Sequence, residues 1–113
     1  MHEMSLAEGI VDIALSTAHQ NSSSRILGIE VAVGDFAGVE REALAFCFDA
    51  VIKGTIAEGA TLQLQAIPLT ARCLDCNLVF APLNYAFKCT YCGSTTVVVE
   101  SGRELKVVSV DLD

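Results

Sequence analysis

Four cysteines constrain the fold of this chain more than any other feature. They form two Cys-x-x-Cys pairs, Cys73 with Cys76 and Cys89 with Cys92, separated by residues 77–88. A two-residue gap lets both sulfurs of one tight turn, a knuckle, point to one place. Two facing knuckles then supply four thiolates in the tetrahedral arrangement that zinc prefers. The segment between them has room for two short strands joined by a turn at residues 82–84, so we predict a zinc ribbon.

The predicted zinc site is closed. Four protein ligands leave the metal no open position for water or substrate, so the zinc is expected to be structural and not catalytic. Two other chemistries use the same residues. Four thiolates also hold a single iron in redox proteins, and an exposed Cys-x-x-Cys pair of low pKa acts in thiol oxidoreductases. Two facing pairs favour zinc over the oxidoreductase.

Charge and composition exclude several classes of protein. The 113 residues are 52% hydrophobic and 19% charged, which is typical of a folded globular chain. Fourteen acidic against seven basic residues give a net charge of −7, which repels nucleic acid. The first twenty residues lack the basic start of a signal peptide, and no run is long enough to span a membrane. We therefore expect a cytoplasmic protein with reduced cysteines and neither a nucleic-acid nor a membrane partner.

Two segments show helical spacing of apolar residues. The first predicted helix runs from Met4 to about Ala18. Its acidic side chains should face solvent or lie near the positive end of the helix dipole. The second spans 39–53 and stops at Gly54. The expected buried positions are Leu6, Ile10, Ile13 and Ala14 on the first helix and Leu44, Cys47, Phe48 and Val51 on the second.

Alternating apolar residues predict strands over 25–33, 60–69, 95–100 and 104–112. In the first strand, Leu27, Ile29, Val31 and Val33 should share one face, and in the second Leu62, Leu64 and Ala66 should do so. Pro68 confines the second strand to a sheet edge or ends its pairing. A terminal strand with no later partner returns most simply to the sheet formed by the first two.

These elements predict an α+β fold in which a small three-stranded sheet with two helices carries an inserted zinc-ribbon module. We place the α/β domain at residues 1–70 and 101–113 and the zinc ribbon at 71–100. An inserted module too small to bury a sufficient core of its own would depend on its metal.

The other candidate for chemistry is the start of the chain, Met1-His2-Glu3. The terminal amine, the deprotonated amide of His2 and the His2 ring Nδ1 can chelate one ion in a plane. Such planar nitrogen donors suit Ni(II) or Cu(II) and not zinc. The fourth position is open to the Glu3 amide, its carboxylate or a group from elsewhere. A histidine near a mobile terminus needs no metal, so the spacing alone leaves this interpretation beside that of a solvated side chain.

No motif in the chain indicates catalysis. His19 fits the last turn of the first helix, where an imidazole interacts well with the helix dipole, and Cys47 fits a buried apolar position. No nucleophile with its base, phosphate loop or pair of catalytic carboxylates is present. The protein is therefore expected not to be an enzyme.

Three segments around the cysteine pairs resemble the HypA/HybF family of nickel-insertion proteins of [NiFe]-hydrogenase maturation. They are MHEMSL at 1–6, GDFAGVEREALAFCFDAVIKGTIAEGATLQLQAIP at 34–68 and GRELKVVSVDLD at 102–113, and the resemblance covers essentially the whole chain. Its most specific parts are the Met-His-Glu terminus, GTIAEGA at 54–60 and the Gly102-x-Glu104-Leu105 that follows the cysteines.

The resemblance implies a nickel metallochaperone with two metal sites. Nickel would bind transiently at His2, with the backbone of Met1 and Glu3 nearby. Structural zinc would bind Cys73, Cys76, Cys89 and Cys92. The implied partners are a HypB-type GTPase and the large-subunit precursor of [NiFe]-hydrogenase, with urease maturation proteins as further candidates.

The chain departs from the family pattern beside two of its cysteines. The family often has Gly after the second cysteine and Pro after the third, where this chain has Asn77 and Thr90. Asn tolerates the left-handed backbone conformation almost as readily as Gly, so Asn77 should still permit the knuckle turn. The zinc prediction therefore stands.

Two rival functions can be distinguished from a nickel chaperone by metal analysis. A zinc-ribbon adaptor would hold one zinc per chain and take up no nickel. A mononuclear iron protein would be strongly coloured and undergo reversible one-electron chemistry, whereas a zinc protein is colourless.

Overall fold

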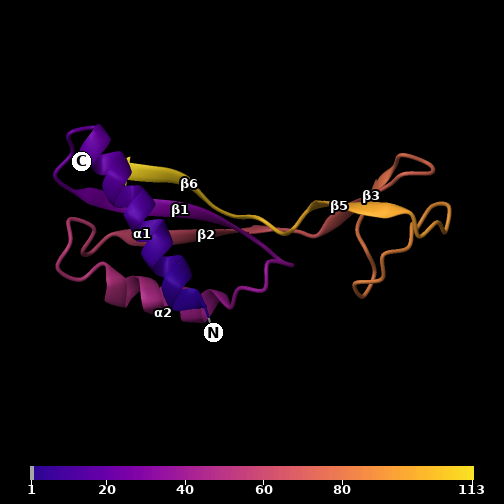
Figure 1. Cartoon of the computed structure of the whole chain (residues 1–113), viewed down its shortest axis with the longest axis horizontal. Helices are drawn as coiled ribbons and strands as arrows, with labels where there is room; N and C mark the ends of the chain where they lie inside the picture. Colours follow the sequence, from indigo (N-terminus) through magenta and orange to yellow (C-terminus); the bar gives the residue numbers. More distant parts are fainter. Residues whose placement is uncertain (1) are drawn as a thin grey trace.

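The computed structural model describes residues 2–113 and contains two three-stranded sheets (Figure 1). The first sheet has the order β2-β1-β6, in which β1 pairs parallel with β2 and antiparallel with β6. The chain runs from α1 (Glu3–Gln20) through β1 (Ile26–Gly34) and α2 (Arg41–Val51) to β2 (Thr61–Ile67), and β6 (Leu105–Leu112) closes the sheet. The predicted α+β architecture and the return of the last strand are confirmed.

Both helices pack with this sheet in one apolar core. Phe48 and Leu44 of α2 are fully buried, as are the inward residues of β1. The inward face of α1 includes Ala7, Ala14 and Ala18, all fully buried. Because these side chains are small, α1 can lie close to α2 and to the sheet. Leu62 and Leu64 of β2 pack against the edge of the core. As Pro68 predicts, β2 is an edge strand, and it ends at Ile67, just before that proline.

Three apolar positions were placed wrongly by simple periodicity. Ile13 is 51% exposed, because α1 turns its alanines and Val11 inward instead. Leu27 is 43% exposed while Ile26 is buried, since the pairing of β1 with β6 is irregular between Ile26 and Gly28 and changes which side chain faces the core. Ala66 also lies exposed near the end of β2.

The second sheet belongs to the cysteine segment. It has the order β4-β3-β5, formed antiparallel by β3 (Thr70–Cys73), β4 (Val79–Phe80) and β5 (Val97–Ser101). The predicted turn at 82–84 is not flanked by two strands between the cysteine pairs. Only β4 forms there, with an isolated bridge between Leu83 and Ala86. Asn84 and Tyr85 have positive φ angles of 51° and 60°, which turn the chain too sharply for a second strand.

A joint connects the two sheets, and it consists of residues 34–36, 67–70 and 101–104. The two segments that link the sheets are 67–70 and 101–104. The end of β1 and the turn after it donate three backbone hydrogen bonds to these linking segments. Gly34 N–H bonds to Glu104 O at 2.7 Å, Asp35 N–H to Ile67 O at 2.8 Å and Phe36 N–H to Gly102 O at 2.7 Å. The linking segments thus lie side by side in the extended molecule, whose extents are 54 × 28 × 16 Å.

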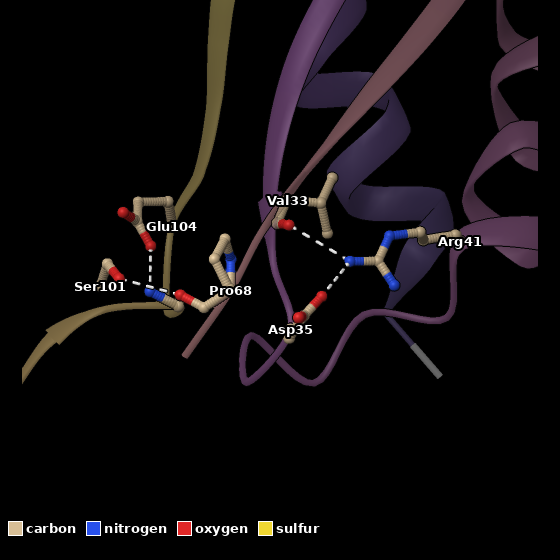
Figure 2. Close-up of polar contacts among 7 residues, drawn as sticks. Val33, Asp35, Arg41, Pro68, Ser101 and Glu104 are labelled. Carbon is tan, nitrogen blue, oxygen red and sulfur yellow. Dashed lines mark hydrogen bonds and ion pairs between the residues drawn. The ribbon is translucent and has the colours of Figure 1, made fainter. Parts of the chain in front are cut away.

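Side chains reinforce the joint (Figure 2). The Ser101 hydroxyl donates to Pro68 O at 2.8 Å, and Glu104 Oε1 accepts from Gly102 N–H at 2.6 Å. Beside them, Arg41 Nη2 donates to Asp35 Oδ1 at 2.9 Å and to Val33 O at 3.3 Å, which ties the start of α2 to the end of β1.

Phe36 extends the joint to the loop between the cysteine pairs. Its ring centroid lies 5.7 Å from that of Tyr85 and 6.0 Å from that of Phe87. The Arg103 guanidinium carbon lies 5.8 Å from the Phe36 centroid. Aromatic pairs and cation–π contacts at such distances are attractive, so this ring holds the loop against the α/β part of the chain.

Acid is expected to weaken the joint through Glu104. The Gly102 amide holds the pKa of this carboxyl below its ordinary value of 4.5, because that hydrogen bond favours the charged form. Since the folded-state pKa is the lower one, the stabilisation is present above the unfolded-state pKa and is lost as pH falls through the folded-state pKa. Glu104→Gln should therefore show a shallower loss of stability with acid than the wild type in urea unfolding from pH 6 to pH 3. If the free energy of unfolding falls equally with pH in Glu104→Gln and the wild type, Glu104 does not have this role.

Candidate metal centres

The four predicted zinc ligands come together. Within residues 2–113, Cys73, Cys76, Cys89 and Cys92 form a group whose Sγ atoms all lie within 4.8 Å of one another. Cys73 Sγ is 3.6 Å from Cys92 Sγ, and Cys76 Sγ is 3.7 Å from Cys89 Sγ. A tetrahedron with zinc–sulfur bonds of about 2.3 Å has sulfur–sulfur edges of about 3.8 Å, so these spacings fit one zinc ion.

The two knuckles have the same local structure. In each, the residue after the second cysteine has a left-handed backbone, Asn77 at φ 63° and Gly93 at φ 78°. Its N–H donates to the carbonyl of the first cysteine, at 2.8 Å from Asn77 to Cys73 and 2.9 Å from Gly93 to Cys89. The expectation that Asn77 permits the knuckle turn is confirmed.

Backbone amides in each knuckle point at the sulfur of the first cysteine. Cys76 N–H donates to Cys73 Sγ at 3.5 Å, and the amides of Tyr91 and Cys92 donate to Cys89 Sγ at 3.4 Å. Although burial of the thiol acts in the opposite direction, the Cys92 and Tyr91 amides lower the pKa of Cys89 to about 6. The Ser94 amide acts to lower the pKa of Cys92. Contact with the other cysteines, above all Cys73, outweighs this effect and raises that pKa to about 12. A divalent metal favours the thiolate form at all four positions.

The start of α1 is tied to the start of α2. His2 is the N-cap residue of α1 and is exposed, while Glu3 is buried with 3% of its surface exposed. Glu3 Oε2 accepts a hydrogen bond from Glu40 N–H at 3.2 Å, and this bond holds the pKa of Glu3 below its usual range. Glu3 Oε1 is buried and has no hydrogen-bond partner. Met1, the third member of the predicted nickel motif, lies outside the described residues.

Sequence reasoning missed the role of Glu40 at this end of the molecule. Its carboxylate caps α2 by accepting from Glu42 N–H at 3.2 Å and Ala43 N–H at 2.7 Å. Its own amide is the donor to Glu3. Glutamate is not among the residues that usually cap helices, so no clear signal in the sequence indicated this cap. The pairing of Glu40 with Glu3, which is distant in sequence, could be found only from the fold.

The two candidate sites lie on opposite sides of the joint. Figure 1 shows the start of α1 beside α2, while the cysteine segment with β3 and β5 lies at the far end of the molecule. His19 is exposed in the last turn of α1, and Cys47 is half-buried against the α/β core, so neither is in the four-cysteine cluster. Among the described residues, neither helix combines the length and apolar character that a membrane span requires.

Comparisons with known proteins agree over the full chain. Residues 1–112 match the family model described as hydrogenase/urease nickel incorporation, metallochaperone, hypA. Similar relatives include the hydrogenase maturation factor HypA of Chlorobaculum tepidum, 42% identical over 113 residues, and that of Dechloromonas aromatica, 37% identical; each match covers 100% of both chains.

Solved structures show the same fold. The solution structure of the Ni metallochaperone HypA from Helicobacter pylori has a TM-score of 0.71 at 21% identity, covering 99% of this chain and 97% of the other. A second solution structure, of a HypA protein, has a TM-score of 0.78 at 22% identity, covering 99% and 96%. The extent of the family match and the identity to curated relatives, together with a cysteine cluster suited to structural zinc, show that this chain belongs to the HypA family of nickel-incorporation metallochaperones.

Proposed function

We propose that this chain binds Ni(II) through its first residues and delivers it, with a HypB-type GTPase, to the large-subunit precursor of [NiFe]-hydrogenase. Urease maturation proteins are further proposed recipients. Residues 1–70 and 101–113 form the proposed nickel-binding domain, and residues 71–100 form a zinc domain held by its four cysteines. The proposed site of action is the cytoplasm, where the four cysteines would stay reduced and available to zinc.

One observation supports the terminus as the nickel site. His2 precedes the first turn of α1, and its carbonyl already accepts the hydrogen bond from Leu6 N–H at 3.1 Å. Amides at a helix start have no intrahelical acceptor, so loss of the His2 amide proton to nickel breaks no bond of α1. The exposed imidazole and the amide are therefore available as ligands while the helix stays intact.

The arrangement also suits release of the ion. Of the proposed ligands, the His2 imidazole belongs to an exposed residue, so a partner can replace it while α1 stays folded. The Glu3–Glu40 hydrogen bond fixes the first helical residue, so only the chain before it needs to move. A zinc ion with four thiolate ligands has no open position at which a partner could begin to replace them.

The test is nickel titration of untagged protein. His2→Ala should weaken nickel binding by roughly a hundredfold or more, since removal of a mere supporting group near a metal already costs 10–100-fold. His19→Ala is the matched control and should bind nickel as the wild type does. Both variants should retain one zinc by elemental analysis.

Three results would overturn the assignment. Unchanged nickel affinity in His2→Ala would show that the imidazole is no ligand. One zinc and no nickel per chain in the wild type would instead indicate an adaptor. A tag placed before Met1 would abolish the terminal amine donor, so an N-terminally extended protein that still binds nickel with full affinity would likewise contradict this site.

A further inference from the structure

The strand β6 lies at an edge of the α/β sheet and has one unpaired side. It pairs with β1, and no strand within residues 2–113 pairs with its other side (Figure 1). Five of its eight residues are valine or leucine. Such an edge offers free backbone N–H and C=O groups to another strand, and soluble proteins usually protect it. The order of side chains along β6 indicates which strand fits there.

A bulge at Val108 decides which side chains of β6 share a face. Val107 lies opposite Val31 of β1 and Ser109 lies opposite Glu30, so Val108 is an extra residue that has no partner on β1. Side chains alternate regularly before this residue and again after it. The positions that pack against the apolar core are Leu105, Val107, Val110 and Leu112.

The free backbone groups of β6 belong to the same four positions. Gly34 N–H donates to Glu104 O, and Asp113 N–H donates to Arg25 O, so the backbone at both ends of β6 is bonded toward β1. Alternate residues of an antiparallel strand direct their backbone groups to opposite sides. From both ends to the bulge, the residues with backbone groups directed away from β1 are therefore 105, 107, 110 and 112.

The sequence of β6 is complementary to itself when a second copy runs antiparallel to it. In the matching register the opposite residues are Leu105 with Leu112, Lys106 with Asp111, Val107 with Val110, and Val108 with Ser109. The bulge makes this register possible. Lys106 and Asp111 are five residues apart and would lie on opposite faces of a regular strand, but the extra residue brings them to one face. Because each copy carries its bulge at the same place, the two strands stay in step.

The charges also match in this register. Lys106 and Asp111 are exposed, and neither takes part in an ion pair within the described part of the chain. On β1 they lie opposite Ala32 and Gly28, which carry no charge. The paired strands would contain two contacts between Lys106 and Asp111, each at a position between hydrogen-bonded pairs, where opposite side chains approach most closely.

Other terms make this association weak. The net charge of −7 repels a second copy at long range. Glu104 and Asp113 lie just outside β6, and in the same register they would face each other across the two strands. An interface made by one strand pair is also small beside the roughly 800 Å² per partner of a standard complex. Association is therefore expected only at high protein concentration.

We propose that β6 is a self-association edge, at which two copies of this chain pair antiparallel to form one six-stranded sheet. The strand order is then β2-β1-β6-β6-β1-β2, with a two-fold axis through the middle of the β6 pair. Because β6 starts at the joint, the two cysteine segments project from opposite ends of this sheet. No residue of β6 belongs to either candidate metal centre, so the proposal is independent of the proposed nickel function.

A charge exchange tests the pairing in the full-length, zinc-loaded protein. Lys106→Asp places like charges opposite each other twice in the dimer, so it should raise the dissociation constant roughly tenfold or more in sedimentation equilibrium. Asp111→Lys should have the same effect. The double variant Lys106→Asp/Asp111→Lys restores two opposite-charge contacts and should dimerise as the wild type does.

Lys53→Asp is the matched control for net charge. Lys53 is exposed and lies outside the sheet, just after α2, so its replacement should leave the dissociation constant unchanged. Thermal midpoint and zinc content establish that all variants are folded. Nickel titration of Lys106→Asp should match the wild type, which separates this test from that of the terminal nickel site.

Nuclear magnetic resonance tests the register. In a mixture of isotope-labelled and unlabelled chains, methyl contacts should join Leu105 of one copy to Leu112 of the other. Within one chain these residues are more than about 20 Å apart along the strand, so the contact can arise only between copies.

Several outcomes would overturn the proposal. The wild type could stay monomeric at every concentration, or Lys106→Asp could dimerise as tightly as Lys53→Asp. A folded double variant that stays monomeric would show that the opposite charges do not determine the pairing. A dimer with intermolecular contacts at 67–70 and 101–104 in place of β6 would show an exchange of segments at the joint and would equally refute the β6 pairing.

Discussion

Replacing Cys89 by serine is expected to remove the zinc and with it the fold of residues 71–100. The core of this segment contains only four buried residues, Ala71, Cys73, Phe80 and Cys89, and two of them are zinc ligands. Structural zinc in small modules binds with an apparent free energy of about 10–16 kcal/mol. A core this small cannot offset the conformational entropy of thirty ordered residues without that contribution.

The α/β part should survive the same substitution. Its core holds fourteen buried residues from both helices, β1 and the connection between α2 and β2, and none of them is a zinc ligand. Amide resonances of residues 71–100 should therefore collapse toward random-coil positions in Cys89→Ser, while those of α1, β1 and α2 stay dispersed. Elemental analysis should find no zinc.

Cys47→Ser is the control for the zinc prediction. Cys47 is half-buried on α2 and packs against the α/β core, away from the four-cysteine cluster. It should keep one zinc per chain and a dispersed spectrum throughout. Full zinc content and dispersed resonances in Cys89→Ser would show that the segment folds without its fourth thiolate.

The zinc ligands were predictable from sequence because their geometry is local. Each Cys-x-x-Cys turn brings its two sulfurs together by backbone conformation alone, and Asn77 and Gly93 supply the left-handed residue that each turn requires. Helix and strand identities were also predictable, since α1 and β1 are long and strongly periodic. Even so, a register irregularity beside Leu27 reversed the faces of Ile26 and Leu27, and periodicity carries no signal for such a shift.

What could not be predicted depends on contacts between distant segments. The hydrogen bond from Glu40 to Glu3 joins two residues that have no shared motif. Glu3 lies near the positive end of the helix dipole, one of the two expected positions, but its burial was not predicted. The ring of Phe36 contacts Tyr85 and Phe87, about fifty residues later in the chain, and no local sequence pattern indicates such a contact. Both contacts follow from the way in which β1, α2 and the linking segments come together.

Gly34→Ala is expected to be strongly destabilising, although it adds only one methyl group. Gly34 is buried at the end of β1, where a Cβ atom would overlap the backbone carbonyl of Gly102 and lie 2.7 Å from Arg103 N. These are backbone atoms, so no rotamer change relieves the overlap. Either the two segments separate, which breaks the bonds from Gly34 to Glu104 and from Phe36 to Gly102, or the strand distorts. The free energy of unfolding should fall by about 3 kcal/mol or more.

Gly9→Ala is the matched control, because it adds the same methyl group where nothing lies within 4 Å. Gly9 is an exposed residue in the interior of α1, so alanine should raise the free energy of unfolding by roughly 1 kcal/mol through helix propensity. Urea unfolding followed by circular dichroism measures both changes. Equal urea midpoints for Gly34→Ala and the wild type would show that the joint accommodates a side chain.

The structural change in Gly34→Ala should extend along the joint but should not reach the zinc cluster. Arg41 bonds to Val33 O and Asp35, so a displaced end of β1 also disturbs the start of α2. The knuckles are held by their own amides and by zinc, and no knuckle residue bonds to Gly34. Chemical-shift changes should therefore extend through 67–70 and 101–104 to Arg41, while the resonances of Cys73 and Cys89 and the zinc content stay as in the wild type. Loss of zinc in Gly34→Ala would mean that the joint, and not the metal alone, holds the cysteine segment together.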